Sequence, residues 1–238
     1  MPTVKRAIIM AAGLGNRMKP VSLKTPKPLI RVNGVRMIDT VIRALHQNGI
    51  NEIYVVIGYL GEQFEVLERE YPGLRLIRNP YYNTCNNISS LYAARDYIEE
   101  AVILDGDQII YDPSILSPEF EYSGYNAIYT EEPTDEWLLQ VDDRNRILSC
   151  SRTGGAYGWQ LYSVSRWTAE DGARLKHHLE LEFEVNQNRQ IYWDDVAMFC
   201  HREEYVLGMR PMQRGSIIEI DSFEELKKLD PTYESYED

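Results

Sequence analysis

The chain lacks an excess of positive charge, a cysteine framework and any long apolar run. Its 37 acidic and 25 basic residues give a formal net charge of −12, which argues against broad binding to nucleic acid or to an anionic membrane. Cys85, Cys150 and Cys200 are odd in number and form no CxxC pair, so we expect neither disulfides nor a zinc–thiolate site. No apolar run approaches the ~20 residues of a membrane span, and no signal-peptide pattern opens the chain. We therefore expect a cytoplasmic protein whose partners are small molecules.

Histidine is also scarce, with four residues in the whole chain. The sequence offers no Ser-His-Asp or Cys-His arrangement of the kind that supports nucleophilic catalysis. His46, His177 and His178 lie on predicted helices and are expected at the surface. Chemistry at an anionic substrate would then depend on lysine, arginine and carboxylate groups.

Alternating strand and helix patterns fill the first half of the chain. Short apolar runs predict buried strands, and apolar residues at helical spacing predict helices between them. The predicted strands are 6–11, 52–57, 74–78 and 101–105, and the predicted helices are 37–48, 62–71 and 88–98. This order predicts an α/β fold, with a Rossmann-like, mostly parallel (mixed) sheet flanked by helices. Because ligands collect at the carboxyl ends of such strands, residues 11–27, 58–59 and 105–107 should share one edge.

The pattern changes after residue 112 to short, alternating segments rich in aromatic residues. These segments predict antiparallel or mixed strands that cover the same edge of the sheet. A long helix is expected from residue 168 to about 184, and the strand IIEID should lead into a helix at 222–229.

The loop AAGLGNRMKPVSLKTPKPL follows the first strand and concentrates positive charge in an acidic protein. Gly13 and Gly15 would let backbone N–H groups approach a polyanion, although a tight turn with solvent-facing cations explains a glycine pair equally well. Proline on both sides of Lys27 stiffens the backbone that carries its ammonium. Arg17 and Lys27 could then meet the charge of a triphosphate from two directions.

With Gly13, Gly15, Arg17 and Lys27 in place, this loop resembles the signature of the sugar-1-phosphate nucleotidyltransferase-like superfamily, G-x-G-x-R followed by P-K-P. Within it, the chain is most similar to the bacterial CTP:phosphocholine cytidylyltransferases. The resemblance extends through GYLGEQFEVL, CNNISSLY, DGDQII, TDEWLL, IYWDD and SIIEIDSFEEL. It implies a nucleotidyltransferase (GT-A-like) fold with a small antiparallel lid region.

The resemblance also implies one domain over residues 1–238 and a division of labour within it. Residues 1–112 would bind the nucleotide, and residues 113–238 would bind the acceptor and supply a second metal ligand. The reaction would transfer CMP from CTP to phosphocholine, release pyrophosphate and form CDP-choline. We expect a monomer or homodimer.

Mg²⁺ is the implied cofactor, and the resemblance assigns Asp107 and Asp221 as its ligands with Glu219 in support. Oxygen ligands of this kind suit Mg²⁺. Two purely structural roles stay open as alternatives: an Asx turn at residues 105–107, and Asp221 as the N-cap of the helix that follows.

Lys27 and Arg17 are the expected catalytic residues, because they would neutralise charge on the phosphates during transfer. A phosphate acceptor is largely dianionic near neutrality, its second pKa being about 6, so the nucleophile needs no general base. The residues expected to bind the nucleotide are Ala11, Ala12, Gly13, Gly15, Asn87 and Ser90. Asn86 and Asn87 precede a predicted helix and could equally be its caps.

Aromatic faces and carboxylates hold a quaternary ammonium. The resemblance implies that the acceptor's amine lies near Trp137, Tyr192, Trp193 and Asp194, because the phosphocholine-specific relatives have a tryptophan and a Tyr-Trp-Asp stretch at matching places. Trp137 and Tyr192 could equally be core aromatics. If residues 191–199 form a strand, Tyr192 and Trp193 face opposite ways and cannot line one pocket.

Other acceptors and other classes of protein remain open at this point. The primary ammonium of 2-aminoethylphosphonate is the alternative acceptor, and a sugar 1-phosphate is a further one. A glycosyltransferase would use the DGD segment as its DxD motif but would not need the opening loop. A non-catalytic homologue would typically have lost a charged position, whereas Arg17, Lys27, Asp107 and Asp221 are all present.

Overall fold

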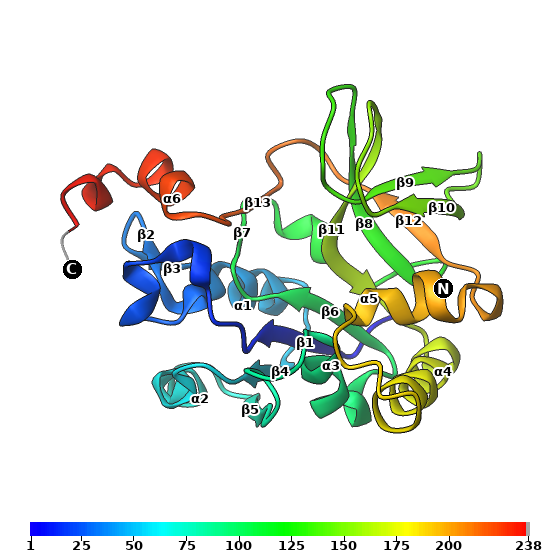
Figure 1. Cartoon of the computed structure of the whole chain (residues 1–238), viewed down its shortest axis with the longest axis horizontal. Coiled ribbons are helices and arrows are strands. Elements are labelled where there is room, and N and C mark those ends of the chain that lie inside the picture. Colours follow the sequence, from blue (N-terminus) through cyan, green and yellow to red (C-terminus); the bar gives the residue numbers. More distant parts are fainter. Residues whose placement is uncertain (237–238) are drawn as a thin grey trace.

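The central element of the fold is a nine-stranded mixed sheet (Figure 1). The computed structural model describes residues 1–236 of the chain. The sheet contains β1 (Arg6–Ala11), β4 (Glu52–Ile57), β5 (Leu74–Arg78), β6 (Ala101–Asp105), β8 (Gly124–Thr130), β9 (Leu138–Val141), β10 (Ile147–Ser151), β11 (Gly158–Arg166) and β12 (Gly208–Pro211). Its path runs β10-β9-β11-β6-β1-β4-β5, and β8 pairs with both β11 and β12. The half formed by β6, β1, β4 and β5 is parallel, and β11 joins it antiparallel to β6.

Helices cover both faces of this sheet, and two small ladders complete the fold. The helices are α1 (Met37–Gln47), α2 (Glu65–Glu70), α3 (Ile88–Ala93), α4 (Ala169–Glu180), α5 (Trp193–Asp195) and α6 (Phe223–Leu229). Two of them continue as π-helical turns, α4 through Leu181–Val185 and α5 through Val196–Cys200. The small ladders pair β7 (Gln108–Ile110) with β13 (Ile217–Glu219), and β2 (Arg31–Val32) with β3 (Val35–Arg36). No helix in the described part of the chain is long and apolar enough to cross a bilayer.

The strand predictions for the first half are confirmed to the residue, while the helix predictions are confirmed with shorter bounds. A 3₁₀ turn, Gly61–Phe64, precedes α2, and another, Arg95–Tyr97, follows α3. Such turns are common at the ends of short helices, where the α-helical hydrogen bonds run out. The segment IYWDDVAMF is not a strand: Tyr192 is the extended N-cap residue of α5, and from Trp193 onward the segment is helical.

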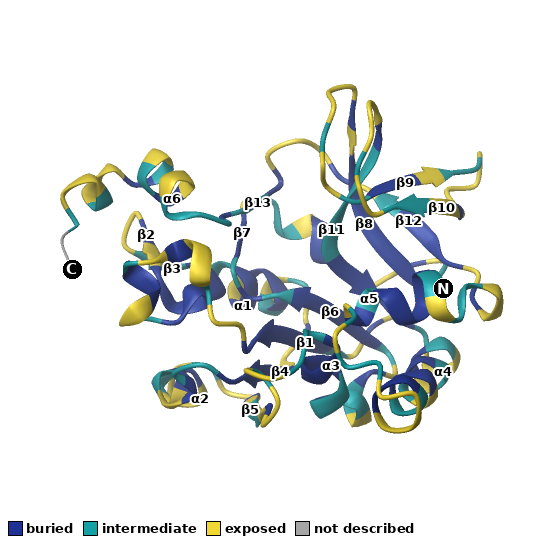
Figure 2. Cartoon of the chain, in the orientation of Figure 1, coloured by how far each residue is buried: buried dark blue, intermediate teal, exposed yellow. Residues whose placement is uncertain are grey.

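Strand β1 shows why the parallel strands are nearly continuous apolar runs. Ala7 and Ile9 join the core beneath α1 and α2, whereas Ile8 and Met10 join a second core beneath α3 and α4. All four are buried, and the inner strands are coloured as buried in Figure 2. A strand covered on both faces has no side that favours polar residues.

A third apolar cluster joins the two ends of the chain. Met18 and Val21 from the opening loop pack with Ile220 and with Leu226 of α6. The N-cap of α6 is Ser222, whose hydroxyl accepts from Glu225 N while the Glu225 carboxylate accepts from Ser222 N. Asp221 is therefore not the N-cap, and its side chain is free to face the opening loop.

The shared edge predicted from strand order is confirmed by register and hydrogen bonds. Ala11 at the end of β1 pairs with Ile57 at the end of β4, and Met10 pairs with Asp105. Tyr59 N donates to Ala12 O at 3.2 Å, and Gly106 N donates to Met10 O at 3.0 Å. Three loops therefore leave the sheet side by side.

Candidate active site

The opening loop holds its charged side chains through a compact backbone. Gly15 has φ of +61°, in the left-handed region that favours glycine, and an added Cβ would lie 3.2 Å from the Cβ of Lys27. An added Cβ at Gly13 would meet no atom within 4 Å. Gly15 therefore permits a turn packed on Lys27, whereas Gly13 leaves open space where a ligand could approach the backbone.

Lys27 connects the two acidic positions that lie far apart in sequence. Its Nζ lies 2.6 Å from Asp107 Oδ2 and 3.0 Å from Asp221 Oδ1. Burial disfavours the ammonium, but the two carboxylates outweigh burial and raise the pKa of Lys27. Pro26 precedes and Pro28 lies within the 3₁₀ turn Lys27–Leu29, so this buried ammonium stands on a constrained backbone.

Arg17 approaches the same centre from the solvent side. Its Nη2 lies 3.1 Å from Asp221 Oδ1, and its side chain is mostly exposed. The structure thus brings Arg17, Lys27, Asp107 and Asp221 to one point at the carboxyl edge of the sheet.

Two further carboxyl groups enter this centre from β6 and β13. Burial, followed by the nearby charges of Asp107 and Glu219, raises the pKa of Asp105 well above its usual range. Burial also raises the pKa of Glu219 to about 7, although its Oε1 accepts a hydrogen bond from Gln108 at 2.7 Å. Asp107 and Asp221 both contact the ammonium of Lys27. Their hard oxygen atoms also suit a divalent cation of the Mg²⁺ type.

These groups line a cleft with two lobes. The first lobe, a cavity of about 340 Å³, lies over the opening loop and is called the loop lobe. It is lined by Met10, Ala11, Gly13, Gly15, Asn16, Arg17, Met18, Lys27, Pro28, Asp105, Asp107 and Asp221. Of the six residues expected to bind a nucleotide, Ala11, Gly13 and Gly15 line this lobe.

Ala12 and Ser90 have structural partners instead. The carbonyl of Ala12 accepts from Tyr59, and the hydroxyl of Ser90, which is 6% exposed, accepts from Asn79 Nδ2 at 3.1 Å. Neither lines the loop lobe.

Asn86 and Asn87 connect the start of α3 to α5 and to the segment before it. Asn86 Nδ2 donates to Gln190 O at 3.1 Å, and Asn87 Oδ1 accepts from Trp193 N at 2.9 Å. Asn87 makes no side-chain cap of α3. Asn87 also lines the second lobe of the cleft, so one side chain contacts both that lobe and α5.

The second lobe, called the aromatic lobe, is a cavity of about 260 Å³ that continues past Asp105, Asp107 and Asp221. Its other lining residues are Arg17, Asn87, Glu136, Trp137, Leu161, Ser163, Tyr192, Asp194 and Glu219. The rings of Trp137 and Tyr192 meet edge to face, with centroids 5.8 Å apart. Burial raises the pKa of Asp194 to about 7.

Trp193 does not join this lobe. It is 1% exposed and packs between Tyr125 and Trp167 in the core beneath α4. Tyr192 is the extended N-cap residue and Trp193 the first helical residue of α5, so the two side chains leave the backbone in different directions. Trp193 thus cannot line the acceptor pocket for which the sequence suggested it.

Sequence reasoning missed three polar or charged residues around the aromatic lobe. Glu136 and Ser163 line it, and Arg152 pairs with Asp195 at 2.5 Å while its guanidinium lies over the rings of Phe199 and Trp137. Glu136 adjoins Trp137 in the segment TDEWLL, which was a usable signal. Ser163 and Arg152 carry no local motif, and only the sheet brings them here.

Charge is distributed unevenly along the cleft. Six carboxyl groups line the aromatic lobe, and Arg17 is its one cationic lining residue among the described residues. They belong to Asp105, Asp107, Glu136, Asp194, Glu219 and Asp221. A cleft with this surplus of acidic groups suits cationic ligands: a divalent ion at one end and an ammonium group at the other.

Comparison with known proteins places these features in a family. The model of the MobA-like NTP transferase domain matches residues 7–164. The 2-aminoethylphosphonate cytidylyltransferase of Lancefieldella rimae is 40% identical over 229 residues, covering 95% of this chain and 92% of that protein. The choline-phosphate cytidylyltransferase of Streptococcus pneumoniae is 32% identical over 225 residues, covering 94% and 96%.

A solved structure agrees over almost the whole chain. The CTP:phosphocholine cytidylyltransferase from Streptococcus pneumoniae (LicC) superposes with a TM-score of 0.89 at 31% identity, covering 97% of this chain and 99% of that one. The nucleotidyltransferase fold with its antiparallel lid region is therefore confirmed.

Proposed function

The chain belongs to the family of MobA-like NTP transferase domains, and on this premise we propose that it is a cytidylyltransferase that transfers CMP from CTP to a small phosphonate or phosphate carrying an amino group. The observation that carries the proposal is the convergence of Lys27, Asp107 and Asp221 at the boundary of the two lobes. The loop lobe would take the triphosphate, and the aromatic lobe would take the acceptor.

The reaction forms one P–O bond and breaks another. An anionic oxygen of the acceptor attacks the α-phosphorus of CTP, and the bond to the β-phosphate breaks with release of pyrophosphate. The attacking oxygen is already deprotonated near neutrality, because the second pKa of a phosphate monoester is about 6. No histidine is found among the described residues that line either lobe, which agrees with a reaction that needs no general base.

The chain's own groups would supply position and charge. Lys27 and Arg17 face the boundary of the lobes, where the two anionic substrates must meet in line. Asp107 and Asp221, with Glu219 nearby, would hold Mg²⁺. When bound there, the ion would neutralise charge on the phosphate oxygens.

We propose 2-aminoethylphosphonate as the first candidate for the acceptor, because the aromatic lobe suits a primary ammonium. A primary ammonium has three N–H donors, and Glu136 and Asp194 offer carboxylate oxygens beside the aromatic pair. With Trp193 in the core, only two of the three candidate aromatics remain for a cage around a quaternary ammonium. Phosphocholine is the second candidate, supported by the edge-to-face pair Trp137 and Tyr192 and by the likeness to LicC.

A pyrophosphate-release assay with four nucleoside triphosphates against a panel of acceptors tests the proposal. The panel contains 2-aminoethylphosphonate, phosphocholine, phosphoethanolamine and glucose 1-phosphate. We expect turnover with CTP, and kcat/KM for 2-aminoethylphosphonate at least about tenfold above that for phosphocholine, the size of one charge-assisted hydrogen bond. Highest kcat/KM with phosphocholine would reverse the order of the two candidates. Turnover restricted to glucose 1-phosphate, or none with any pair, would contradict the proposed function.

A further inference from the structure

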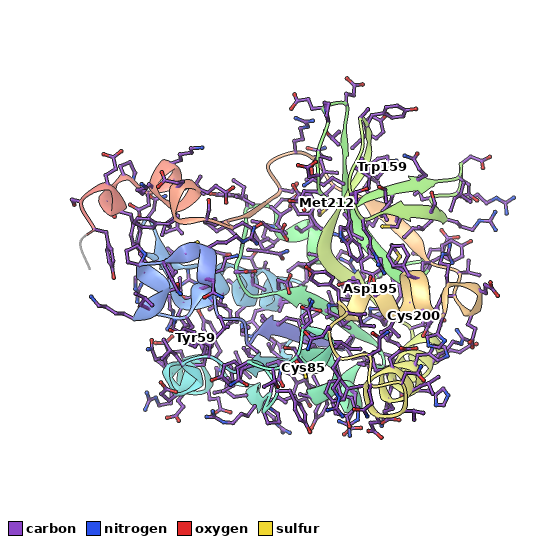
Figure 3. The ribbon with its side chains drawn as sticks, viewed as in Figure 1. Tyr59, Cys85, Trp159, Asp195, Cys200 and Met212 are labelled. Carbon is purple, nitrogen blue, oxygen red and sulfur yellow. The ribbon has the colours of Figure 1, made fainter. Side chains whose placement is uncertain are left out.

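A histidine cluster lies outside the cleft, where α4 packs on the π-helical turn that follows α5. His178 belongs to α4, His201 directly follows the turn Val196–Cys200, and Glu204 lies in the 3₁₀ turn Arg202–Glu204. Figure 3 labels Asp195, the residue before that π-helical turn, and Cys200, its last residue. His178 was expected at the surface but is 4% exposed, because it packs on His201 and Tyr205.

These three side chains have the spacing of metal ligands. One ligand atom from each of His178, His201 and Glu204 lies within 4.8 Å of the other two, and no other trio of His, Cys, Asp or Glu does so among residues 1–236. Glu204 Oε1 lies 3.4 Å from His178 Nε2 and 3.8 Å from His201 Nδ1. Ligand atoms on a tetrahedral zinc ion with bonds of about 2.0 Å are separated by about 3.3 Å.

The Nε2 atom of His201 already has a hydrogen-bonding partner. Its Nε2 lies 3.0 Å from Oε1 of the buried Glu182, whose two oxygens also accept from Asn186 Nδ2 and Asn188 Nδ2, each at 3.1 Å. This contact anchors Nε2 to Glu182. The ring nitrogen that remains for another ligand is Nδ1, which faces Glu204.

His178 is held in a matching way. Its Nδ1 is hydrogen-bonded to the Tyr205 hydroxyl at 2.8 Å, which leaves Nε2 toward Glu204. Each ring thus has one nitrogen anchored and the other directed at one carboxylate, the arrangement by which partners orient histidine ligands around metal ions.

We propose that His178 Nε2, His201 Nδ1 and the Glu204 carboxylate form a binding site for a divalent transition metal ion of the Zn²⁺ type. Imidazole and carboxylate ligands suit such an ion, and the exposed Glu204 leaves a path for its entry and for a water ligand. The two rings stack with centroids 3.8 Å apart and an angle of 7°. An imidazole nitrogen binds a metal ion in the plane of its ring, so one of these stacked rings must rotate away from the other for both nitrogens to bind one ion.

The site would be structural and separate from the cleft. None of its residues lines either lobe. His201 follows the helical segment whose first turn carries Asp194, and His178 belongs to α4, so a bound ion would clamp that segment onto α4. The metal would then stiffen the helix behind the aromatic lobe without taking part in transfer.

Calorimetric titration of the full-length, chelator-stripped chain with Zn²⁺ alone tests the proposal. Millimolar Mg²⁺ in the buffer would occupy the carboxylates of the cleft. We expect one Zn²⁺ per chain, with the same affinity in D221N, and a dissociation constant raised at least about tenfold in E204Q and H201Q. H177Q is the matched control, because His177 is the exposed histidine next to His178 and lies outside the trio.

The outcomes separate a metal site from a hydrogen-bonded histidine cluster. Glu204 is exposed, so E204Q should keep the wild-type circular dichroism spectrum, and a weaker affinity in that variant then reports the lost ligand. Absence of zinc binding by the wild type, or equal affinity in E204Q and H177Q, would overturn the proposal. Loss of zinc binding in D221N would do so as well, because it would place the ion in the cleft.

Discussion

The two lobes of the cleft are built in different ways. Consecutive residues of one loop form most of the loop lobe, and that loop is packed against the ends of β1 and β6. The aromatic lobe draws on segments far apart in sequence, around Asn87, Trp137, Ser163 and Tyr192. The first lobe holds the buried ammonium, whereas acidic and aromatic side chains dominate the second.

This difference teaches where variation can occur. A loop that positions Lys27 through Gly15 and two prolines tolerates little change, because backbone and charge are set together. Side chains delivered by separate segments can be exchanged one at a time. Changes in the loop lobe should therefore affect turnover, and changes in the aromatic lobe should affect the choice of acceptor.

The largest effect is expected for Lys27→Ala. The substitution removes the ammonium that faces both Asp107 and Asp221, and kcat should fall by roughly two or more orders of magnitude. Steady-state assays with CTP and the best acceptor measure this, with circular dichroism to show that the fold persists. The exposed Lys24→Ala is the control and should keep wild-type activity. A K27A enzyme with near wild-type kcat would remove Lys27 from the mechanism.

Asp221→Asn should come next. It removes half of the carboxylate pair proposed for Mg²⁺, and we expect kcat at saturating Mg²⁺ to fall by about a hundredfold. The Mg²⁺ concentration for half-maximal rate should also rise. Glu224→Gln, an exposed change on α6, provides the control. An unchanged Mg²⁺ titration would show that Asp221 does not hold the ion.

Gly15→Ala tests whether the loop lobe depends on its backbone. A side chain at φ of +61° costs about 1–2 kcal/mol, and its Cβ would crowd that of Lys27 at 3.2 Å. We expect a lower melting temperature and a fall in kcat of about tenfold, which corresponds to 1.4 kcal/mol. Gly34→Ala carries similar strain at φ of +83° with no atom within 4 Å, so it should lose stability but keep kcat. Equal kcat losses in both variants would mean that strain alone explains the effect.

Glu136→Gln tests the aromatic lobe. If the carboxylate receives the acceptor's ammonium, KM for the acceptor should rise about five- to tenfold, while KM for CTP stays constant. Glu131→Gln is the control, because Glu131 is exposed and does not line the lobe. A parallel rise in KM for both substrates would contradict the separation of the two lobes.

The smallest effect concerns the pH dependence of stability. Burial raises the pKa of Asp194 from 3.8 to about 7, so the folded state keeps a proton that the unfolded state releases. This contribution to stability is present below about pH 4 and is lost as pH rises through about 7. The melting temperature of Asp194→Asn should therefore gain a few degrees relative to wild type as the pH rises from about 4 to about 7. The exposed Asp143→Asn should show a constant difference, and a constant difference in D194N would refute the assignment.

Much of the nucleotide side was predictable because its signals are local. The strand bounds at 6–11, 52–57, 74–78 and 101–105 followed from apolar runs, and their order predicted the shared edge. The acceptor side was less predictable. Trp193 and Tyr192 are adjacent aromatic residues, and the sequence supports both equally as acceptor-binding residues. Trp193 lies in the core, whereas Tyr192 lines the cleft. No local pattern indicates which core a helix will cover.

The sequence by itself determined the parallel sheet, the loop with its constrained lysine, and the kind of chemistry those residues could support. Periodicity, proline and glycine act over a few residues, so they can be read without a fold. Only the tertiary structure decided that Asp221 joins Lys27 across 194 positions and that His178, His201 and Glu204 meet behind the cleft. Such meetings depend on how apolar faces pack, which is a property of the whole chain.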